Sequence, residues 1–172
     1  MKIAIMGYAG SGKTFLAKYL SEKQHIPALH LDEVKYTKEW KPIPDEQALP
    51  QVARFLEKDS WIIDGNYHYL YQQERLEMAD LVLLVMLPRF PCLLRCLRRK
   101  KDRQAEGYTN DTNLWFIQFV LFEGRSRKRR QNFTRITEDY RDKVICLRSQ
   151  KEIDRFIQSV EENSLPLPPP NE

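Results

Sequence analysis

The segment GYAGSGKT, from Gly7 to Thr14, constrains the fold of this chain more than any other feature. It fits the pattern G-x-x-x-x-G-K-[ST], with Gly12, Lys13 and Thr14 closing the pattern. An apolar, β-branched run precedes it and residues with helical periodicity follow it, so it joins a predicted strand to a predicted helix. Glycines let backbone N–H groups converge, and the helix N-terminus adds partial positive charge. The segment therefore predicts a polyphosphate-binding loop, called the phosphate loop below.

The residues of the phosphate loop have distinct expected roles. We expect Lys13 to reach the β- and γ-phosphates of ATP, and the Thr14 hydroxyl to bind Mg²⁺. An ordinary glycine turn between strand and helix is the alternative interpretation. The residues expected to bind the nucleotide along this segment are Gly7, Ala9, Gly10, Ser11, Gly12, Lys13, Thr14 and Phe15.

Length and composition limit the class of protein. The chain has 172 residues, 42% of them hydrophobic, which suits one globular domain or a domain with a small lid. No run reaches the roughly 18 apolar residues of a membrane span, and the chain opens directly with a predicted strand. Three cysteines without a second ligand pair favour reduced core thiols. We expect a cytoplasmic protein without a membrane partner, as a monomer or a homodimer.

Positive charge is concentrated in one region. The net charge of the chain is +4, but residues 89–130 carry twelve Lys or Arg against four Asp or Glu, a balance of +8. In a chain with a phosphate loop, such a region predicts a lid over a polyphosphate, which we place at approximately residues 95–130. A nucleic-acid surface is the less favoured alternative.

Strand and helix patterns alternate regularly, which predicts an α/β fold with a parallel sheet and helices on both faces. We expect a single domain over residues 1–163 and a loose proline-rich tail over residues 164–172. Residues 35–46 are typical of a loop. The predicted strands are Ile3–Met6, Ala28–Leu31, Trp61–Ile63, Leu81–Leu87 and Val144–Leu147.

Helical patterns separate these strands. Pro50 is expected in the first turn of one helix, and residues 113–130 are expected to form one long helix. Besides the helix after the phosphate loop, the predicted helical segments are residues 52–58, 69–79, 93–100, 113–130 and 151–160.

Acidic residues follow two predicted strands at the sheet edge where parallel α/β proteins bind ligands. Asp32 follows the second strand and Asp64 follows the third. We assign Asp64 to Mg²⁺ through its water shell, and Asp32 to the acceptor hydroxyl or to the metal, together with Thr14. Capping of a helix or turn is the alternative for both. Asp80 precedes the fourth strand, at the opposite edge, and is interpreted as a cap.

Arginines after the fourth strand are candidates for neutralising charge on a transferring phosphoryl group. We favour Arg95 and Arg99, one helical turn apart, with Arg98 as the alternative. Arg125 and Arg127 belong to a second cluster that is placed to reach the same site. A solvated basic helix face is the alternative interpretation for both clusters.

Several motifs together resemble a known family. In chain order they are GYAGSGKT, LHLDEV, WIIDGNY, ADLVLLVMLPR, the arginine-rich segment and VICLRS. They make the chain resemble the adenylate-kinase-like group of small P-loop proteins, and most closely the subset known as DNA topology modulation proteins, up to about Val160. The resemblance implies a P-loop NTPase fold with a five-stranded parallel sheet in the order 2-3-1-4-5, an ATP site and a lid. It also implies that Arg148, Ser149 and Gln150 lie beside the adenine.

Two departures from the relatives leave the acceptor open. An adenylate kinase carries Pro-Arg after the D-G of strand three, whereas Asn66 and Tyr67 follow Gly65 here. A shikimate-kinase-like chain would carry a glycine triplet at the same place. The candidates for an aromatic acceptor pocket, each with packing as its alternative role, are Trp40, Tyr67, His68 and Tyr69.

We therefore expect an ATP- and Mg²⁺-dependent phosphotransferase that moves the γ-phosphoryl group to a nucleoside, a nucleotide or a hydroxylated metabolite. ATP hydrolysis alone is one alternative, and a nucleotide-binding regulator that modulates DNA topology through its basic region is another. A GTPase is disfavoured because the chain has no [NT]-K-x-D base-reading motif. The predicted catalytic residues are Lys13, Asp32, Asp64, Arg95 and Arg99.

Overall fold

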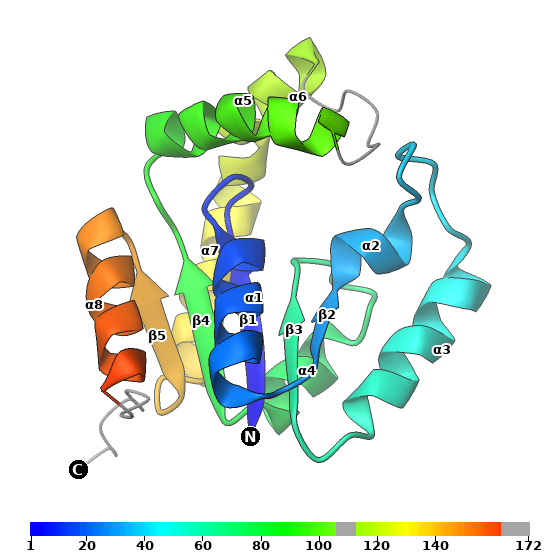
Figure 1. The fold of residues 1–172 in the computed structure, drawn as a ribbon, viewed down its shortest axis with the longest axis vertical. Coiled ribbons are helices and arrows are strands. Elements are labelled where there is room, and N and C mark those ends of the chain that lie inside the picture. The colour runs from blue at the N-terminus through cyan, green and yellow to red at the C-terminus, as the bar shows by residue number, and fades with distance from the viewer. Residues whose placement is uncertain (106–112, 163–172) are drawn as a thin grey trace.

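The structure, a computed structural model, describes the backbone of residues 1–105 and 113–162, and the side chains of these residues except 99–105. It consists of one sheet between two layers of helices (Figure 1). The predicted tail and part of the predicted lid lie outside the described residues. The limits of the domain and of the lid therefore stay predictions.

A five-stranded parallel sheet in the order β2-β3-β1-β4-β5 forms the centre, which confirms the predicted fold class and strand order. Its strands are β1 (Lys2–Gly7), β2 (Ala28–His30), β3 (Trp61–Asp64), β4 (Leu81–Val85) and β5 (Val144–Leu147). The inner strands β1, β3 and β4 are buried on both faces, which explains why they are nearly continuous apolar runs.

Helices cover both faces of the sheet (Figure 1). On one face α1 and α8 pack with β1 and β4; on the other, α4 and α7 pack with the same strands. The helices are α1 (Lys13–Gln24), α2 (Leu31–Lys35), α3 (Asp45–Leu56), α4 (Gln72–Met78), α5 (Arg89–Ala105), α6 (Leu114–Leu121), α7 (Arg127–Asp139) and α8 (Gln150–Glu161). Two apolar cores therefore share one sheet.

Three element boundaries differ from prediction near the site. Asp64 is the last residue of β3, where it pairs with Ile5, and does not follow the strand. Leu31, predicted to end the second strand, begins α2, a helix that we did not predict. Asp32 lies in the first turn of α2, where a carboxylate stabilises the helix N-terminus. Strand β4 ends at Val85, two residues before the predicted end.

The predicted continuous helix over residues 113–130 is wrong. Helix α6 ends at Leu121, a 3-10 turn covers Glu123–Arg125, and α7 begins at Arg127. The Ser126 hydroxyl accepts a hydrogen bond from the Arg129 backbone N–H at 3.4 Å. Serine at this position caps a new helix and so competes with continuation of the old one.

The predicted place of Pro50 is also wrong. It lies inside α3, because that helix begins five residues earlier, at Asp45, with Pro44 at the N-cap position. Two acidic residues in the first turn favour the earlier start.

Two predictions about composition can be checked. All three cysteines are free, and Cys92 and Cys96 are buried, as expected. Among the described residues, every helix is too short or too polar to span a bilayer.

Candidate functional site

The phosphate loop connects β1 to α1 at the carboxyl edge of the sheet. Gly7, Gly10 and Gly12 have φ values of 142°, 73° and 100°, a region that side chains other than glycine rarely adopt. A Cβ at Gly7 would overlap the carbonyl of Val85, and a Cβ at Gly10 would lie 2.5 Å from the carbonyl oxygen of Cys92. No side chain caps the N-terminus of α1. The loop therefore offers backbone N–H donors to an anion.

Two polar side chains of the loop lie where a ligand would bind. Lys13 is the first residue of α1, and its Nζ donates a hydrogen bond to the Tyr8 carbonyl oxygen at 3.0 Å. The Ser11 hydroxyl is fully buried and has no hydrogen-bond partner in the described part of the chain. A buried polar atom without a partner is costly, and a bound polar ligand would satisfy it.

Asp64 is the centre of a hydrogen-bonded group beside the loop. Its Oδ2 accepts a hydrogen bond from the Thr14 hydroxyl at 2.8 Å, and its Oδ1 accepts one from His30 Nδ1 at 2.7 Å. The hydrogen bond to Asp64 raises the pKa of His30 above its ordinary value, although burial opposes the shift. The structure thus brings together Thr14 and Asp64, two of the three predicted metal ligands.

These residues fit a magnesium ion. Mg²⁺ prefers oxygen ligands and is usually held by one or two protein groups together with phosphate oxygens and water. Thr14 and Asp64 are oxygen donors 2.8 Å apart. Within the described residues, no group of three or more His, Cys, Asp or Glu could hold a metal ion. The two oxygen donors of this site suit a Mg²⁺ ion that would take its remaining ligands from phosphate and water.

Asp32 does not contact this group and instead belongs to an aromatic cluster. Its Oδ1 accepts a hydrogen bond from the Tyr67 hydroxyl at 2.7 Å. Burial, and then Asp32, raise the pKa of Tyr67, so the phenol stays protonated. Ring centroids of Tyr36 and Tyr67 are 6.5 Å apart, those of Tyr67 and Tyr69 6.1 Å, and those of Tyr36 and Trp40 5.4 Å. Three of the four predicted acceptor-pocket residues therefore lie in one cluster.

The loop after β3 is tied directly to the phosphate loop. The Asn66 side chain accepts a hydrogen bond from the Gly7 N–H at 3.0 Å and donates one to the Gly7 carbonyl at 2.6 Å. The sequence patterns assign Asn66 no role in the site. His30 was likewise given no role, although its predicted place at the end of a strand could have indicated a partner on the next strand.

Arg75 is a buried cation that the sequence analysis missed. It donates hydrogen bonds to the carbonyls of Gly65 at 3.1 Å, Tyr67 at 2.8 Å and Leu70 at 3.0 Å. Burial lowers the pKa of Arg75 to about 10, so the guanidinium remains charged at neutral pH. It holds the loop that carries Asn66 and Tyr67. In the sequence it is an ordinary basic residue of a predicted helix, and no local pattern distinguishes it.

Arg95 connects the phosphate loop to α8. One of its nitrogens donates to the Ser11 carbonyl at 2.8 Å, and another donates to the Gln150 side chain. Ser149 is the N-cap of α8 and accepts a hydrogen bond from the Glu152 N–H. The predicted role of Arg99 rests on a side chain outside the described residues.

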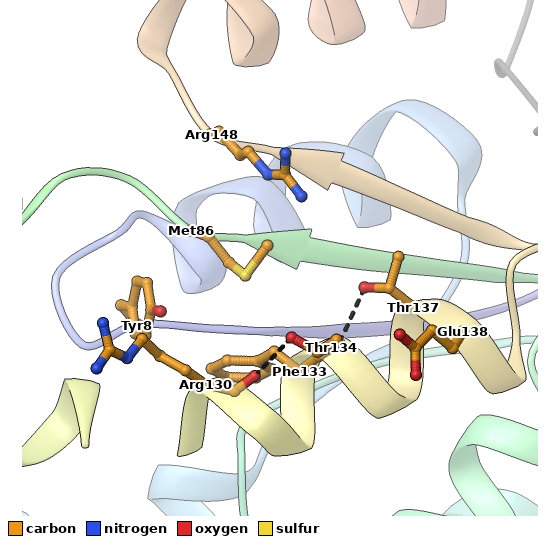
Figure 2. Close-up of a pocket in the computed structure, with 8 residues that line it drawn as sticks. All are labelled: Tyr8, Met86, Arg130, Phe133, Thr134, Thr137, Glu138 and Arg148. Atoms are coloured by element: carbon orange, nitrogen blue, oxygen red, sulfur yellow. Dashed lines mark hydrogen bonds between the residues drawn. The ribbon is translucent and has the colours of Figure 1, made fainter. Parts of the chain in front are cut away.

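The predicted nucleotide-binding roles of Arg148, Phe15 and Ala9 stay predictions, and the structure gives only the positions of these residues. Arg148 lines a pocket of about 310 Å³ between α7 and the ends of β4 and β5, near Tyr8 of the phosphate loop (Figure 2). Phe15 is exposed on α1, and Ala9 packs against the core. Arg125, from the second basic cluster, lies over the Tyr8 ring at 3.9 Å.

Comparisons with known proteins support the fold. No family model matches the chain, and the search of curated proteins found no match. A candidate kinase from Chloroflexus aurantiacus J-10-fl has a similar structure, with a TM-score of 0.54 and 15% identity over 94% of this chain and 97% of that one. An uncharacterized protein from Eubacterium ventriosum ATCC 27560 is similar at a TM-score of 0.51 and 19% identity, over 94% and 98% of the two chains. At these identities the likeness shows a shared α/β fold alone.

Proposed function

We propose that the protein binds ATP with Mg²⁺ at the phosphate loop and transfers the γ-phosphoryl group to a small-molecule acceptor. The observation that carries the proposal is the 2.8 Å hydrogen bond between Thr14 and Asp64. This hydrogen bond places two oxygen atoms suited to Mg²⁺ at the start of α1, a helix whose N–H groups are suited to phosphate. The similar fold of a candidate kinase adds support.

The residues of the loop would act mainly by positioning and by neutralising charge. Backbone N–H groups and Lys13 hold the phosphates, and the Thr14 hydroxyl donates a hydrogen bond to Asp64, which leaves the hydroxyl lone pairs available to a cation. The bound metal supplies positive charge that offsets the negative charge on the transferring group. Arg95, already bonded to Ser11, is close enough to the loop to add a second cation.

Asp32 and Tyr67 are the proposed acceptor side of the site. The Tyr67 hydroxyl occupies only one oxygen of Asp32, so the carboxylate can still accept a hydrogen bond from an acceptor hydroxyl. The aromatic rings around Tyr67 suit a planar acceptor. We propose a nucleoside, a nucleotide or a hydroxylated metabolite as the acceptor.

The proposal can be tested by calorimetric titration with ATP in the presence of Mg²⁺. Wild type should bind, and Lys13→Ala should lose most of the affinity because phosphate contacts depend on the ammonium group. Lys23→Ala, an exposed lysine in the last turn of α1, is the matched control and should bind like wild type. A screen of nucleosides, nucleotides and hydroxylated metabolites should then find an acceptor that stimulates ADP release.

Four outcomes would contradict the proposal. If wild type had no affinity for ATP, or if Lys13→Ala had unchanged affinity, the phosphate loop would not be the nucleotide site. ADP release that no acceptor stimulates would reduce the activity to hydrolysis. ADP release stimulated by DNA, with a steep dependence on salt, would favour the regulatory alternative.

A further inference from the structure

Helices α5 and α6 expose large apolar side chains on their outer surface. These six residues, called the lid face below, are Phe90 (72% exposed), Leu94 (48%), Leu97 (43%), Leu114 (73%), Trp115 (59%) and Phe122 (62%). The other large hydrophobic residues exposed in the described part of the chain are scattered over other elements: Met1, Phe15, Tyr69 and Met78. Scattered exposed residues need no explanation, but a gathered set does.

The lid face points away from the core. On α5, Cys92 and Cys96 are buried, whereas Phe90, Leu94 and Leu97 follow the i, i+4, i+7 spacing of the opposite side. On α6 the same contrast separates buried Val120 from Trp115 and Phe122. Helix α5 is thus apolar on two sides, and the core of this chain covers only one of them.

The two helices form one continuous surface at one end of the molecule. Helix α5 packs against α6, and the Arg89 guanidinium of α5 lies 5.8 Å from the centre of the ring of Phe122, the residue that follows α6. Figure 1 shows both helices at the end of the molecule opposite the N-terminus. The lid face is therefore open to a partner that approaches from this end.

The size of the lid face can be compared with known interfaces. At 59–72% exposure, its three aromatic side chains alone offer roughly 400 Å². The three leucines raise the total above the 300–600 Å² typical of the largest patch on a monomer. A standard interface buries about 800 Å² on each partner. The lid face is thus large enough for the core of a stable dimer.

The composition of the lid face also suits a protein partner. Among the described side chains of α5 and α6, the charged residues are Arg89, Arg95 and Arg98. Arg95 is directed to Ser11, and Arg89 lies over an aromatic ring. Aromatic residues together with arginine are typical of interface cores.

We propose that the lid face is a homodimer interface, in which the α5–α6 pair packs against the same pair of a second copy. The proposal does not depend on the proposed function. A homodimer would nevertheless affect the proposed function, because α5 also carries Arg95, which contacts the phosphate loop. Dimerisation would therefore restrain a helix that contacts the phosphate loop.

Sedimentation velocity over a range from low to several hundred micromolar protein tests the proposal. Wild type should be a dimer with micromolar affinity. Leu94→Glu should weaken dimerisation at least about 100-fold, because it would bury an unpaired carboxylate in the interface. Met78→Glu, which changes an exposed methionine of α4, should dimerise like wild type. Circular dichroism should show that both variants are folded.

The same experiment can overturn the proposal. Wild type that remains monomeric at the highest concentration would do so, and so would a dimer that persists in both Leu94→Glu and Trp115→Glu. If monomeric wild type instead bound anionic lipid vesicles or single-stranded DNA, and Leu94→Glu abolished that binding, the lid face would have a different occupant.

Discussion

The Asp64 carboxylate accepts a hydrogen bond on each of its oxygens, from Thr14 and from His30. Both oxygens are therefore oriented before any ligand arrives. Side chains locked in this way meet a metal and a phosphate without a large cost in conformational entropy. The two partners are on different elements, α1 and β2, so the orientation depends on the whole edge of the sheet.

Substituting Asp64→Asn should separate catalysis from binding. The amide keeps the size of the side chain but loses the charge, and its nitrogen cannot accept the second hydrogen bond. We expect turnover to fall roughly 100-fold or more, while ATP affinity changes less than about tenfold. Titration calorimetry and steady-state ADP release measure the two quantities. Asp59→Asn, at an exposed position before β3, should change neither. Turnover that survives in Asp64→Asn would refute the metal assignment.

Residues of the site differ in how far the sequence could reveal them. Lys13 and Thr14 lie in the G-x-x-x-x-G-K-[ST] pattern, and Asp64 follows an apolar run. The local sequence was therefore enough to predict roles for these three residues. His30 and Asn66 matter because of what lies across from them, since their partners are 34 and 59 positions away. Such pairs depend on strand register, which periodicity alone does not determine.

At the scale of elements, Arg75 connects helix α4 to the loop after β3. Its guanidinium donates hydrogen bonds to two buried carbonyls and one partly buried carbonyl of the loop that leaves the sheet there. The loop is held by a side chain because it is too irregular to be held by its own backbone.

Arg75→Met should therefore be strongly destabilising. It fills much of the same space but leaves carbonyls of Gly65, Tyr67 and Leu70 without donors, each at a cost of about 1–3 kcal/mol before relaxation. We expect the free energy of unfolding to fall by roughly 3 kcal/mol or more, measured by urea denaturation. Arg54→Met, on the exposed side of α3, should change it by less than about 0.5 kcal/mol. Equal effects of the two variants would contradict this role.

The start of α8 should make stability depend on pH. Glu152 accepts a hydrogen bond from the Arg148 N–H at 2.6 Å, and this contact is the first cause that lowers the pKa of Glu152 below 4.5. Because folding favours the ionised form, the contribution is present above pH 4.5 and is lost as the pH falls through the lowered pKa. Glu152→Gln should therefore be less stable than wild type at pH 7, and the difference should shrink on acidification.

Urea denaturation of both proteins at neutral pH and at about pH 3.5 measures this difference. Glu57→Gln, at an exposed position after α3, is the control and should show a smaller dependence on pH. A difference between wild type and Glu152→Gln that stays constant with pH would show that charge plays no part.

Two of the errors at the element scale share one cause. The predicted long helix over residues 113–130 and the predicted strand end at Leu31 both extended an apolar pattern past a local stop signal. Ser126 caps α7, and acidic Asp32 favours the start of α2. Apolar runs tell which residues are buried, but short capping signals decide where an element ends.

At the scale of the whole molecule, two cores on opposite faces of one sheet depend on each other. Strand β4 sends alternate side chains into both, so neither core can unfold without exposing the other. The alternation of strands and helices was sufficient to predict this architecture, because a parallel sheet must be covered on both faces. The strand order came from resemblance to relatives, since alternation allows several orders.

This coupling predicts that a bound nucleotide stabilises the entire chain. Saturating ATP with Mg²⁺ should raise the thermal midpoint in a single transition, by a free energy of about 2.7 kcal/mol at a concentration 100-fold above the dissociation constant. Differential scanning calorimetry should show this shift in wild type and in Lys23→Ala, and almost none in Lys13→Ala. Two transitions, only one of them sensitive to ATP, would contradict the coupling.

Arg95 has internal partners, Ser11 and Gln150, before any substrate arrives. A nucleotide that recruits this guanidinium must first replace contacts the polypeptide already makes with itself. Loss of these contacts therefore offsets part of the attraction between Arg95 and the phosphates when the nucleotide binds. The same contacts can re-form when the nucleotide leaves. We expect this competition to shorten the residence of the spent nucleotide and so to favour repeated turnover over tight storage.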